Sequence, residues 1–389
     1  GVAQTVSEIL GYAVRLGASD VHIECYEDDV DVRFRIDGGL RNIATPLARD
    51  NVAAAVSRIK VLAEIDIAER RIAQDGRISA TFEHDGQRRP IDFRVSVVPG
   101  PFGEDAVLRL LDSQRPVVGL DGLGFRGEAL ARYRRLVDNS EGLILVSGPT
   151  GSGKTTTLYA TLDRLNTPDN KILTVEDPIE YYFPKINQKQ VSAQMSFAEY
   201  ARAFMRQNPD IILIGEIRDE ATADAAMRAA QTGHLVLATV HANDAVRTIT
   251  RLRSLGLEPN AVAGVLLGAV SQRLARRLCP ACRVPHAPEP AHLDWLPGLE
   301  GTFYEAAGCP ACEHEGYRGR IALYELFEVT PPIADAIAHG TAIHEIRHAA
   351  VQGGMPTLLQ DGLAKAREGL TSLDELMRVV PYRMVLAER

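Results

Sequence analysis

The segment Gly148-Pro-Thr-Gly-Ser-Gly-Lys154-Thr155 has the residue types and spacing of a loop that binds phosphate. It fits GxxxxGK[ST] in full, follows an apolar run and opens a helix-like run, which is the context that this motif requires. Its glycines let the backbone curl until successive N–H groups face phosphate oxygens at the positive end of a helix dipole. A chance lysine in a glycine-rich turn would not explain strand, loop and helix together.

The ligand expected at this loop is ATP with Mg²⁺. Lys154 should reach the β- and γ-phosphates, and the Thr155 hydroxyl should ligate Mg²⁺. The predicted nucleotide-binding residues of the loop are Gly148, Pro149, Thr150, Gly151, Ser152, Gly153, Lys154, Thr155 and Thr156.

Acidic residues end two further apolar runs, Ile172 to Glu176 and Ile211 to Ile214. Ligands of open α/β sheets bind at the edge where such strands end. Adjacent residues of a strand point to opposite faces, so only one of Glu176 and Asp177 should face the phosphates, and which one stays open. Glu216, just past the second run, is the candidate general base that would deprotonate the attacking water. Glu176 and Glu216 are therefore candidate catalytic residues and Asp177 a candidate nucleotide contact.

Two histidines bracket the apolar run Leu235 to Val240. His241 lies at the end where phosphates are expected, so we predict that it contacts the nucleotide. His234, at the opposite end, is better explained as a structural residue. Asp219, which precedes the helical stretch Glu220 to Gln231, is better explained as a helix cap than as a catalyst.

Four of the five cysteines form two Cys-Pro-Ala-Cys pairs, Cys279 with Cys282 and Cys309 with Cys312. Two such turns bring four thiolates together in the tetrahedral cage typical of structural Zn²⁺. A redox role is the alternative, but it needs only one pair. Cys25, alone in strand-like sequence, is predicted to be a packed thiol.

The surrounding sequence indicates an α/β protein with five regions. Residues 1–112 alternate in the period-2 manner of strands around two helical stretches, with hairpin signals at Asp37-Gly38 and Asp85-Gly86. Residues 113–125, rich in proline and glycine, are predicted to be a linker. Residues 126–276 alternate strand and helix as in a parallel sheet covered on both faces. Residues 277–320 hold the zinc-binding element, and residues 321–389 form a helical region whose last helix is capped by Ser372 and Glu375.

Composition narrows the class of protein. Apolar residues make up 46% and charged residues 24% of the chain, as in a globular protein, and no run is long enough to cross a bilayer. Gly1 stands where a complete protein has Met, and no signal-peptide pattern follows, so we expect the chain to begin within a longer protein. The formal net charge of −8, without a run of Lys or Arg, argues against a specific nucleic-acid partner.

The motifs together resemble the secretion-superfamily ATPases of type II secretion and type IV pilus assembly. The phosphate loop is followed in the family's order by Val175-Glu-Asp-Pro-Ile-Glu180, Gly215-Glu-Ile-Arg-Asp219 and Gly233-His234 with His241. Arg206-Gln-Asn-Pro-Asp210 resembles a further family segment, with Asn208 as the one departure. The resemblance runs from about Ser19 to Met377. The cysteine pairs are similar to those of the pilus-assembly and type II secretion branch, whereas retraction ATPases generally lack them.

What the resemblance implies goes beyond the motifs. It implies a PAS-like sensor domain, a RecA-like ATPase domain and a homo-hexameric ring in the cytoplasm, peripheral to the inner membrane through platform and cytoplasmic-face partners. It also implies roles for four arginines. Arg94 and Arg109 resemble family arginines of the first domain that reach the nucleotide as arginine fingers do, and Arg202 and Arg206 resemble two more near the site.

Two other functions fit parts of the sequence. A nucleic-acid translocase could use the same core, although the acidic composition predicts weak and non-specific binding only. A scaffold gated by nucleotide without hydrolysis would not need both Lys154 and Glu216. The interpretation that uses every motif is an ATP-hydrolysing motor subunit of a secretion or pilus machine.

Overall fold

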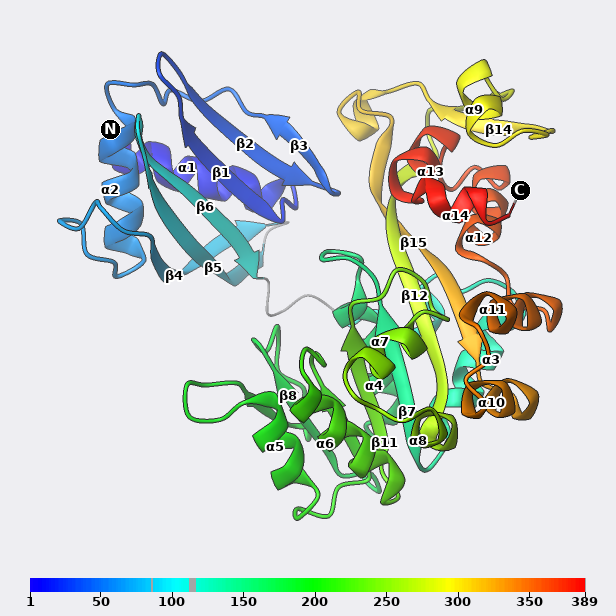
Figure 1. The fold of residues 1–389 in the computed structure, drawn as a ribbon. Helices are drawn as coiled ribbons and strands as arrows, with labels where there is room; N and C mark the ends of the chain where they lie inside the picture. Colours follow the sequence, from blue (N-terminus) through cyan, green and yellow to red (C-terminus); the bar gives the residue numbers. More distant parts are fainter. Residues whose placement is uncertain (85–86, 112–116, 389) are drawn as a thin grey trace. The chain divides into compact units, whose positions relative to one another are not determined.

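The computed structural model describes residues 1–84, 87–111 and 117–388, which divide into two compact units, 1–116 and 117–389 (Figure 1). The predicted turn at residues 85 and 86 and the start of the predicted linker fall outside the described residues. None of the helices within the described ranges is long and apolar enough to cross a membrane.

The first unit is an antiparallel sheet with two helices on one face. The sheet has the order β3-β2-β1-β6-β5-β4, and the helices α1 and α2 pack on it through one apolar cluster. Asp37 and Gly38 both have positive φ, as the predicted two-residue hairpin turn requires. The elements are α1 (Val2–Arg15), β1 (Asp20–Cys25), β2 (Val30–Ile36), β3 (Gly39–Asn42), α2 (Val52–Leu62), β4 (Gln74–His84), β5 (Gln87–Gly100) and β6 (Gly103–Leu111).

The second unit is built on a seven-stranded sheet with the order β15-β12-β7-β11-β10-β8-β9. All neighbouring strands are parallel except β15, which runs antiparallel to β12. Its first strands and helices are η1 (Leu120–Gly122), α3 (Glu128–Val137), β7 (Gly142–Ser147), α4 (Lys154–Leu165), β8 (Ile172–Glu176), β9 (Asn187–Gln190), α5 (Phe197–Phe204), β10 (Ile211–Ile214), α6 (Glu220–Gln231), β11 (Leu235–Val240), α7 (Thr248–Ser254) and α8 (Pro259–Val265).

Both faces of this sheet are covered, as the continuous apolar strands predict. Along β7, Leu143 and Leu145 belong to the cluster with α5, α6 and α8, whereas Ile144 and Val146 belong to the cluster with α3 and α4. Burial on both faces holds the carboxyl ends of β7, β8, β10 and β11 at one edge. That edge carries the phosphate loop and the acidic residues.

The chain beyond α8 continues the same sheet before it forms the C-terminal region. It comprises β12 (Leu266–Leu278), β13 (Arg283–His286), α9 (Pro290–Trp295), β14 (Phe303–Ala306), η2 (Pro310–Cys312), β15 (Tyr317–Glu328), α10 (Pro331–Ala338), α11 (Ile343–Gln352), α12 (Leu358–Arg367), α13 (Leu373–Val379) and α14 (Tyr382–Leu386). The sheet therefore extends past residue 276, where the sequence analysis ends the ATPase domain, because β15 returns to pair with β12.

Two other expectations need correction. The described part of the predicted linker, residues 117–125, packs on the second unit: Leu120 and Leu123 are buried, and the Phe125 ring stacks on Tyr324. Ser372 does cap α13 by accepting from the Glu375 N–H at 3.2 Å, but the Glu375 carboxylate binds arginines instead of closing the capping box, and α14 follows α13 as the last helix.

Candidate functional site

The phosphate loop lies between β7 and α4, as its sequence context predicts. Gly148, Gly151 and Gly153 have φ values of +145°, +78° and +90°, which side-chain-bearing residues rarely adopt. The Lys154 Nζ folds back over the loop and donates to the carbonyls of Gly148 at 2.9 Å and Pro149 at 3.1 Å. Burial lowers the pKa of Lys154, and the nearby Glu216 carboxylate opposes this shift.

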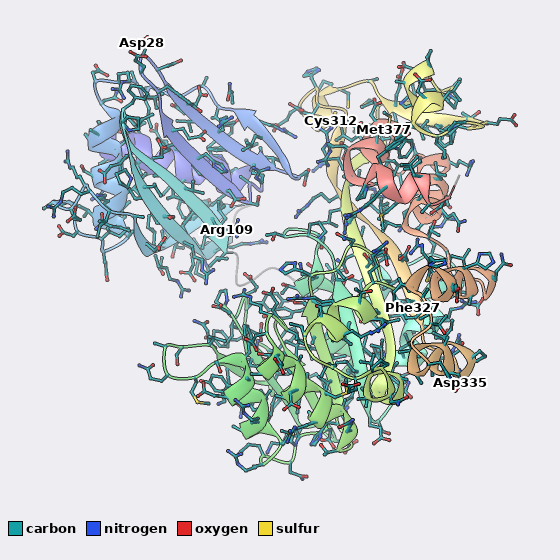
Figure 2. All side chains as sticks on the ribbon, in the orientation of Figure 1. Asp28, Arg109, Cys312, Phe327, Asp335 and Met377 are labelled. Carbon is teal, nitrogen blue, oxygen red and sulfur yellow. The ribbon has the colours of Figure 1, made fainter. Side chains whose placement is uncertain are left out.

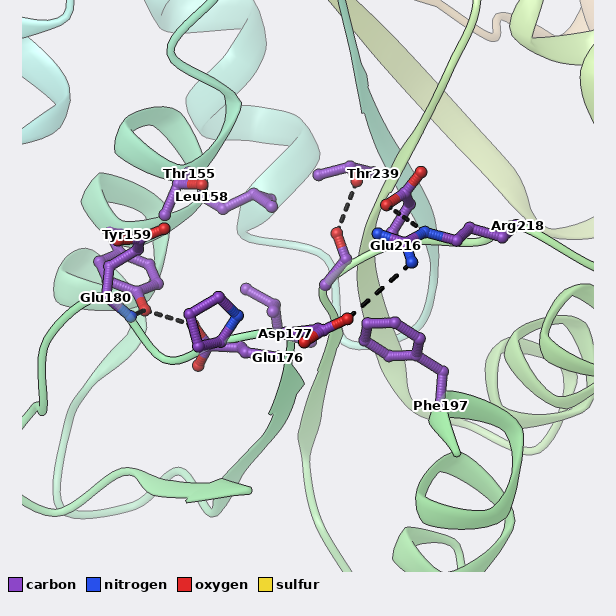
Figure 3. Close-up of a pocket in the computed structure, with 13 residues that line it drawn as sticks. Thr155, Leu158, Tyr159, Glu176, Asp177, Glu180, Phe197, Glu216, Arg218 and Thr239 are labelled. Carbon is purple, nitrogen blue, oxygen red and sulfur yellow. Dashed lines mark hydrogen bonds and ion pairs between the residues drawn. The ribbon is translucent and has the colours of Figure 1, made fainter. Parts of the chain in front are cut away.

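Three polar side chains meet where β10 and β11 end. The Glu216 carboxylate, largely buried, accepts from the Arg218 Nε at 2.6 Å (Figure 3). It also lies 2.8 Å from the His241 Nε2. Arg218 also approaches Asp177, with 3.9 Å between the guanidinium and the carboxylate. Arg218 and His241 therefore each engage one oxygen of the Glu216 carboxylate and hold it in place at the edge of the sheet.

A cavity of about 90 Å³ opens beside these residues, and several predicted site residues line it together (Figure 3). Its polar lining includes Thr155, Asp177, Glu180 and Glu216, in addition to Arg218. Hydroxyl and carboxylate oxygens are the ligands that Mg²⁺ prefers, so this set of donors fits a magnesium ion.

The two adjacent acids at the end of β8 differ in environment. The buried Glu176 carboxylate accepts from the Tyr159 hydroxyl, from Thr174 Oγ1 at 2.6 Å and from Gln188 Nε2 at 3.2 Å. Asp177, in contrast, is exposed at the edge of the sheet. Glu176 thus lines the cavity with its carboxylate held in an internal network, while the carboxylate of Asp177 approaches only Arg218 among the contacts described above.

Two residues given structural roles by the sequence have them. Asp219 caps α6 by accepting from the Thr222 N–H at 2.8 Å. His234 lies at the other end of α6, where its Nδ1 is 2.9 Å from the Ala229 carbonyl oxygen.

Arg202 lies in the last turn of α5 and Arg206 two residues past its end, and both are exposed. The cavity is lined by Phe197, at the opposite end of this helix, and by neither arginine. Within one chain, therefore, these two guanidinium groups are not among the groups that surround the cavity.

In the first unit, Arg94 and Arg109 face one another across the β5–β6 pair (Figure 2 labels Arg109). The strand register extends this pair into a transverse row, because Arg77 lies opposite Arg94 and Asp20 lies opposite Arg109. The Arg109 Nε donates to Asp20 at 2.9 Å. The row lies on the face of the sheet away from the helices, since Phe93 and Leu108, adjacent in sequence to these arginines, are fully buried in the apolar cluster.

The four cysteines of the two pairs converge at the ends of β12 and β15, and Cys312 is labelled in Figure 2. The Sγ atoms of Cys279 and Cys309 are 3.9 Å apart, and those of Cys282 and Cys312 are 3.7 Å apart. Four sulfurs at about 2.3 Å from one tetrahedral Zn²⁺ would be separated by about 3.8 Å, so the cage fits this ion.

The surroundings of the cage also suit a metal-bound thiolate. Burial opposes ionisation of the Cys312 thiol, but the N–H groups of Cys309 and Gly316 point at its sulfur and lower its pKa to about 7. The remaining cysteine, Cys25, packs in the first unit, where burial raises the pKa of its thiol.

Sequence reasoning missed some residues of the site. Arg218, which binds Glu216, lies inside the quoted Gly-Glu-Ile-Arg-Asp motif, and its position two residues after the candidate base could have identified it. Tyr159 and Gln188 carry no signal of their own, because only the folded sheet brings α4 and β9 to Glu176.

The match to known proteins extends over nearly the whole chain. The family model described as Type II/IV secretion system protein matches residues 1–378. The type II secretion system ATPase E of Vibrio cholerae is 44% identical over 383 residues, which are 97% of this chain and 75% of that protein. The type IV pilus assembly ATPase PilB of Myxococcus xanthus is 45% identical over 384 residues, 97% of this chain and 67% of that protein.

The fold matches as well. A crystal structure of the pilus retraction motor PilT with bound ADP is similar, with a TM-score of 0.64 at 27% identity, and the match covers 95% of each chain. The chain thus belongs to the family of type II/IV secretion system proteins.

Proposed function

We propose that the chain hydrolyses ATP and that the work of hydrolysis powers type IV pilus assembly or type II protein secretion. The observation that carries the proposal is the meeting, at one edge of the sheet, of a complete phosphate loop with a Glu216 carboxylate held by Arg218 and His241. The names of the relatives, an ATPase of type II secretion and an ATPase of pilus assembly, support the same conclusion.

Each residue of the edge takes one role. Lys154 leaves the loop carbonyls and binds the β- and γ-phosphates. Thr155 and the acidic oxygens of the cavity would hold Mg²⁺, which would supply positive charge against the phosphates. Asp177 is the acid of the β8 end that faces the ligand, and Glu176 keeps that end in position through Tyr159.

Glu216 accepts the proton of the attacking water. Both of its oxygens are engaged, so one contact must open before a water can reach it. His241 is the partner proposed to withdraw, because Arg218, which is equally exposed, is also paired with Asp177 at 3.9 Å. Its position past the end of β11 also lets it contact the nucleotide, so its departure would couple nucleotide binding to release of the base.

The test separates binding from chemistry. Glu216→Gln keeps the size of the side chain and removes the base, so ATP should bind nearly as tightly while turnover falls by about 10²-fold or more. Lys154→Ala, the comparison, should lose both binding and turnover because a charge that faces phosphate is gone. Parent-like turnover in Glu216→Gln would show that Glu216 is not the general base. Loss of ATP binding in the same variant would make Glu216 a structural or metal-site residue.

We further propose that the active form is a homo-hexamer in the cytoplasm, attached to the inner membrane through platform and cytoplasmic-face partners. In a ring, Arg202 and Arg206 would be exposed cations that a neighbouring subunit's nucleotide could meet. ATPase activity per subunit should then rise steeply with protein concentration. A specific activity that is independent of concentration, in a monomer by light scattering, would contradict the ring.

The cysteine cage completes the proposal as a structural zinc site. Four sulfurs saturate tetrahedral coordination, so no position is open for a substrate. We assign Zn²⁺ to Cys279, Cys282, Cys309 and Cys312.

A further inference from the structure

Behind the phosphate loop lies a buried glutamine that the sequence analysis did not single out. Gln272 is on β12, one residue beyond the Ser271–Ser147 pair that joins β12 to the end of β7. Its side chain is 1% exposed. Both atoms of its amide are used: Nε2 donates to the Ser152 carbonyl at 2.7 Å, and Oε1 accepts from Thr157 Oγ1 at 2.8 Å. Its two partners lie on either side of Lys154 in the sequence.

The loop also packs directly on Gln272. A Cβ added at Gly148 would lie 2.6 Å from the Gln272 carbonyl oxygen, and a Cβ added at Gly153 would lie 3.0 Å from its Nε2. Real Cβ contacts are essentially never shorter than 3.0 Å. Gly148 is therefore required by contact with the β12 backbone as well as by its positive φ, whereas a side chain at Gly153 would crowd the Gln272 amide and push it by a few tenths of an ångström.

The hydrogen bond to Ser152 has a consequence on the ligand side of the loop. In a trans peptide the carbonyl of one residue and the N–H of the next point in opposite directions. Because Gln272 holds the Ser152 carbonyl on the β12 side, the Gly153 N–H points away from β12. A phosphate loop binds its ligand through backbone N–H groups that converge on the phosphate oxygens.

We propose that Gln272 is a positioning residue that fixes the peptide between Ser152 and Gly153, and the first turn of α4 through Thr157, in the form that binds phosphate. The proposal rests on the nucleotide site described above and adds a residue to it. Without Gln272 the loop must orient this peptide when the nucleotide arrives, and that ordering reduces affinity for ATP and ADP alike.

The alternative is that Gln272 only fills the core. The two roles differ in what they change: a core residue affects the unfolding temperature, whereas a loop-positioning residue affects the nucleotide dissociation constant and KM. Gln272→Met preserves length and bulk and removes both hydrogen bonds. Gln272→Glu keeps the acceptor for Thr157 but has no donor for Ser152. Thr157→Val leaves the Ser152 bond intact and serves as the milder variant.

The experiment is calorimetric titration of Mg-ADP into each variant, with KM and kcat for ATP and the thermal midpoint measured alongside. Gln272→Met should raise the ADP dissociation constant and KM about tenfold, with a smaller change in kcat. Gln272→Glu should lose at least as much, and Thr157→Val less. Ser271→Ala, the neighbouring buried residue of β12 on the opposite face of the strand, should match the parent.

An unchanged ADP dissociation constant in Gln272→Met, whether or not the thermal midpoint falls, would make Gln272 a core residue only and overturn the proposal. The ADP titration does not require hydrolysis. If the parent binds Mg-ADP but does not turn over ATP, the proposed function fails while the role of Gln272 is still decided. If the parent binds no nucleotide, both fail.

Discussion

The three neighbouring arginines of the first unit, Arg77, Arg94 and Arg109, allow a prediction in which a substitution lowers ATPase activity without lowering stability. Arg94 has arginines as its cross-strand neighbours on both sides, Arg77 and Arg109. Asp92 pairs with Arg77, and Asp20 with Arg109. Like charges directly opposite one another in a sheet cost a few tenths of a kcal/mol each. Because the three arginines of the row are exposed and two of them are paired with acids, Arg94→Ala should change the free energy of unfolding by no more than about 0.5 kcal/mol.

The effect on turnover should be larger if these guanidinium groups reach the nucleotide. An exposed ion pair contributes at most about 1 kcal/mol, which corresponds to a factor of about five in rate. A contact with phosphate that strengthens in the transition state contributes well over that. We therefore expect Arg94→Ala and Arg109→Ala each to lower kcat/KM for ATP at least tenfold, with parent-like circular dichroism and zinc content.

Arg33→Ala is the matched control. Arg33 lies on β2, and its side chain pairs with Glu24, with the Arg33 Nε donating at 2.8 Å. Its loss should leave turnover at the parent rate. The assay is steady-state ATP hydrolysis at a protein concentration where the parent is fully active. Parent rates in both Arg94→Ala and Arg109→Ala would refute the reasoning, and the row would then be an ordinary polar face of a sheet.

Two further predictions concern the C-terminal region. Elemental analysis should find about one Zn²⁺ per chain in the parent and in Cys25→Ser, and much less in Cys279→Ser, because Cys279 belongs to the cage and Cys25 does not. Equal zinc contents in the two variants would contradict the assignment. The Glu375 carboxylate is buried, which opposes ionisation, but hydrogen bonds from Arg378 and Arg276 lower its pKa below the ordinary 4.5. A depressed pKa adds stability above pH 4.5 that disappears as pH falls through the lower, folded-state value. Glu375→Gln should therefore lower the free energy of unfolding by about 2 kcal/mol at pH 7 and by less in acid. Glu368→Gln, which affects an exposed pair, should lower it by under about 1 kcal/mol. Thermal midpoints measured against pH test this, and a loss of stability in Glu375→Gln that does not change with pH would exclude the carboxylate as its cause.

Much of the second unit could be predicted from local pattern. The apolar runs Ile211 to Ile214 and Leu235 to Val240 are strands with those same bounds, and α6 spans Glu220 to Gln231 as expected. These elements are buried on both faces or capped by a specific side chain, so their sequences contain the physical reason for their structure. The phosphate loop belongs to the same class, because its glycines and its flanking elements are all local.

The differences arise where distant segments meet. The antiparallel return of β15 follows about forty residues after β12, and pattern alone does not say which sheet a late strand will join. Residues 117–125 look like linker because of their glycines, but two leucines and a phenylalanine in them contact the core of the second unit. Only the Ser372 half of the predicted capping box forms, because the Glu375 carboxylate binds Arg276 and Arg378 and not the N–H of Ser372.

The same reasoning explains the candidate site. Residues that bind phosphate or ligate metal recur as spaced motifs, so Lys154, Glu216 and the four cysteines could be proposed from the sequence as candidates. Residues that hold them have no fixed spacing: Tyr159 reaches Glu176 from α4, and Gln272 reaches the loop from a strand more than a hundred residues later. Their selection depends on tertiary contact, and only a structure reveals it.

β12 connects the two chemical centres of the second unit. Gln272 contacts the phosphate loop, and Cys279, seven residues further, is a cage ligand just past the end of the strand. At about 3.3 Å per residue, the two lie roughly 23 Å apart, so a zinc ion in the cage is far too distant to touch a phosphate. The cage instead joins the end of β12 to the start of β15, since η2 ends at Cys312 and β15 begins at Tyr317. A zinc ion would therefore hold together β12 and β15, and β12 also contacts the phosphate loop through Gln272.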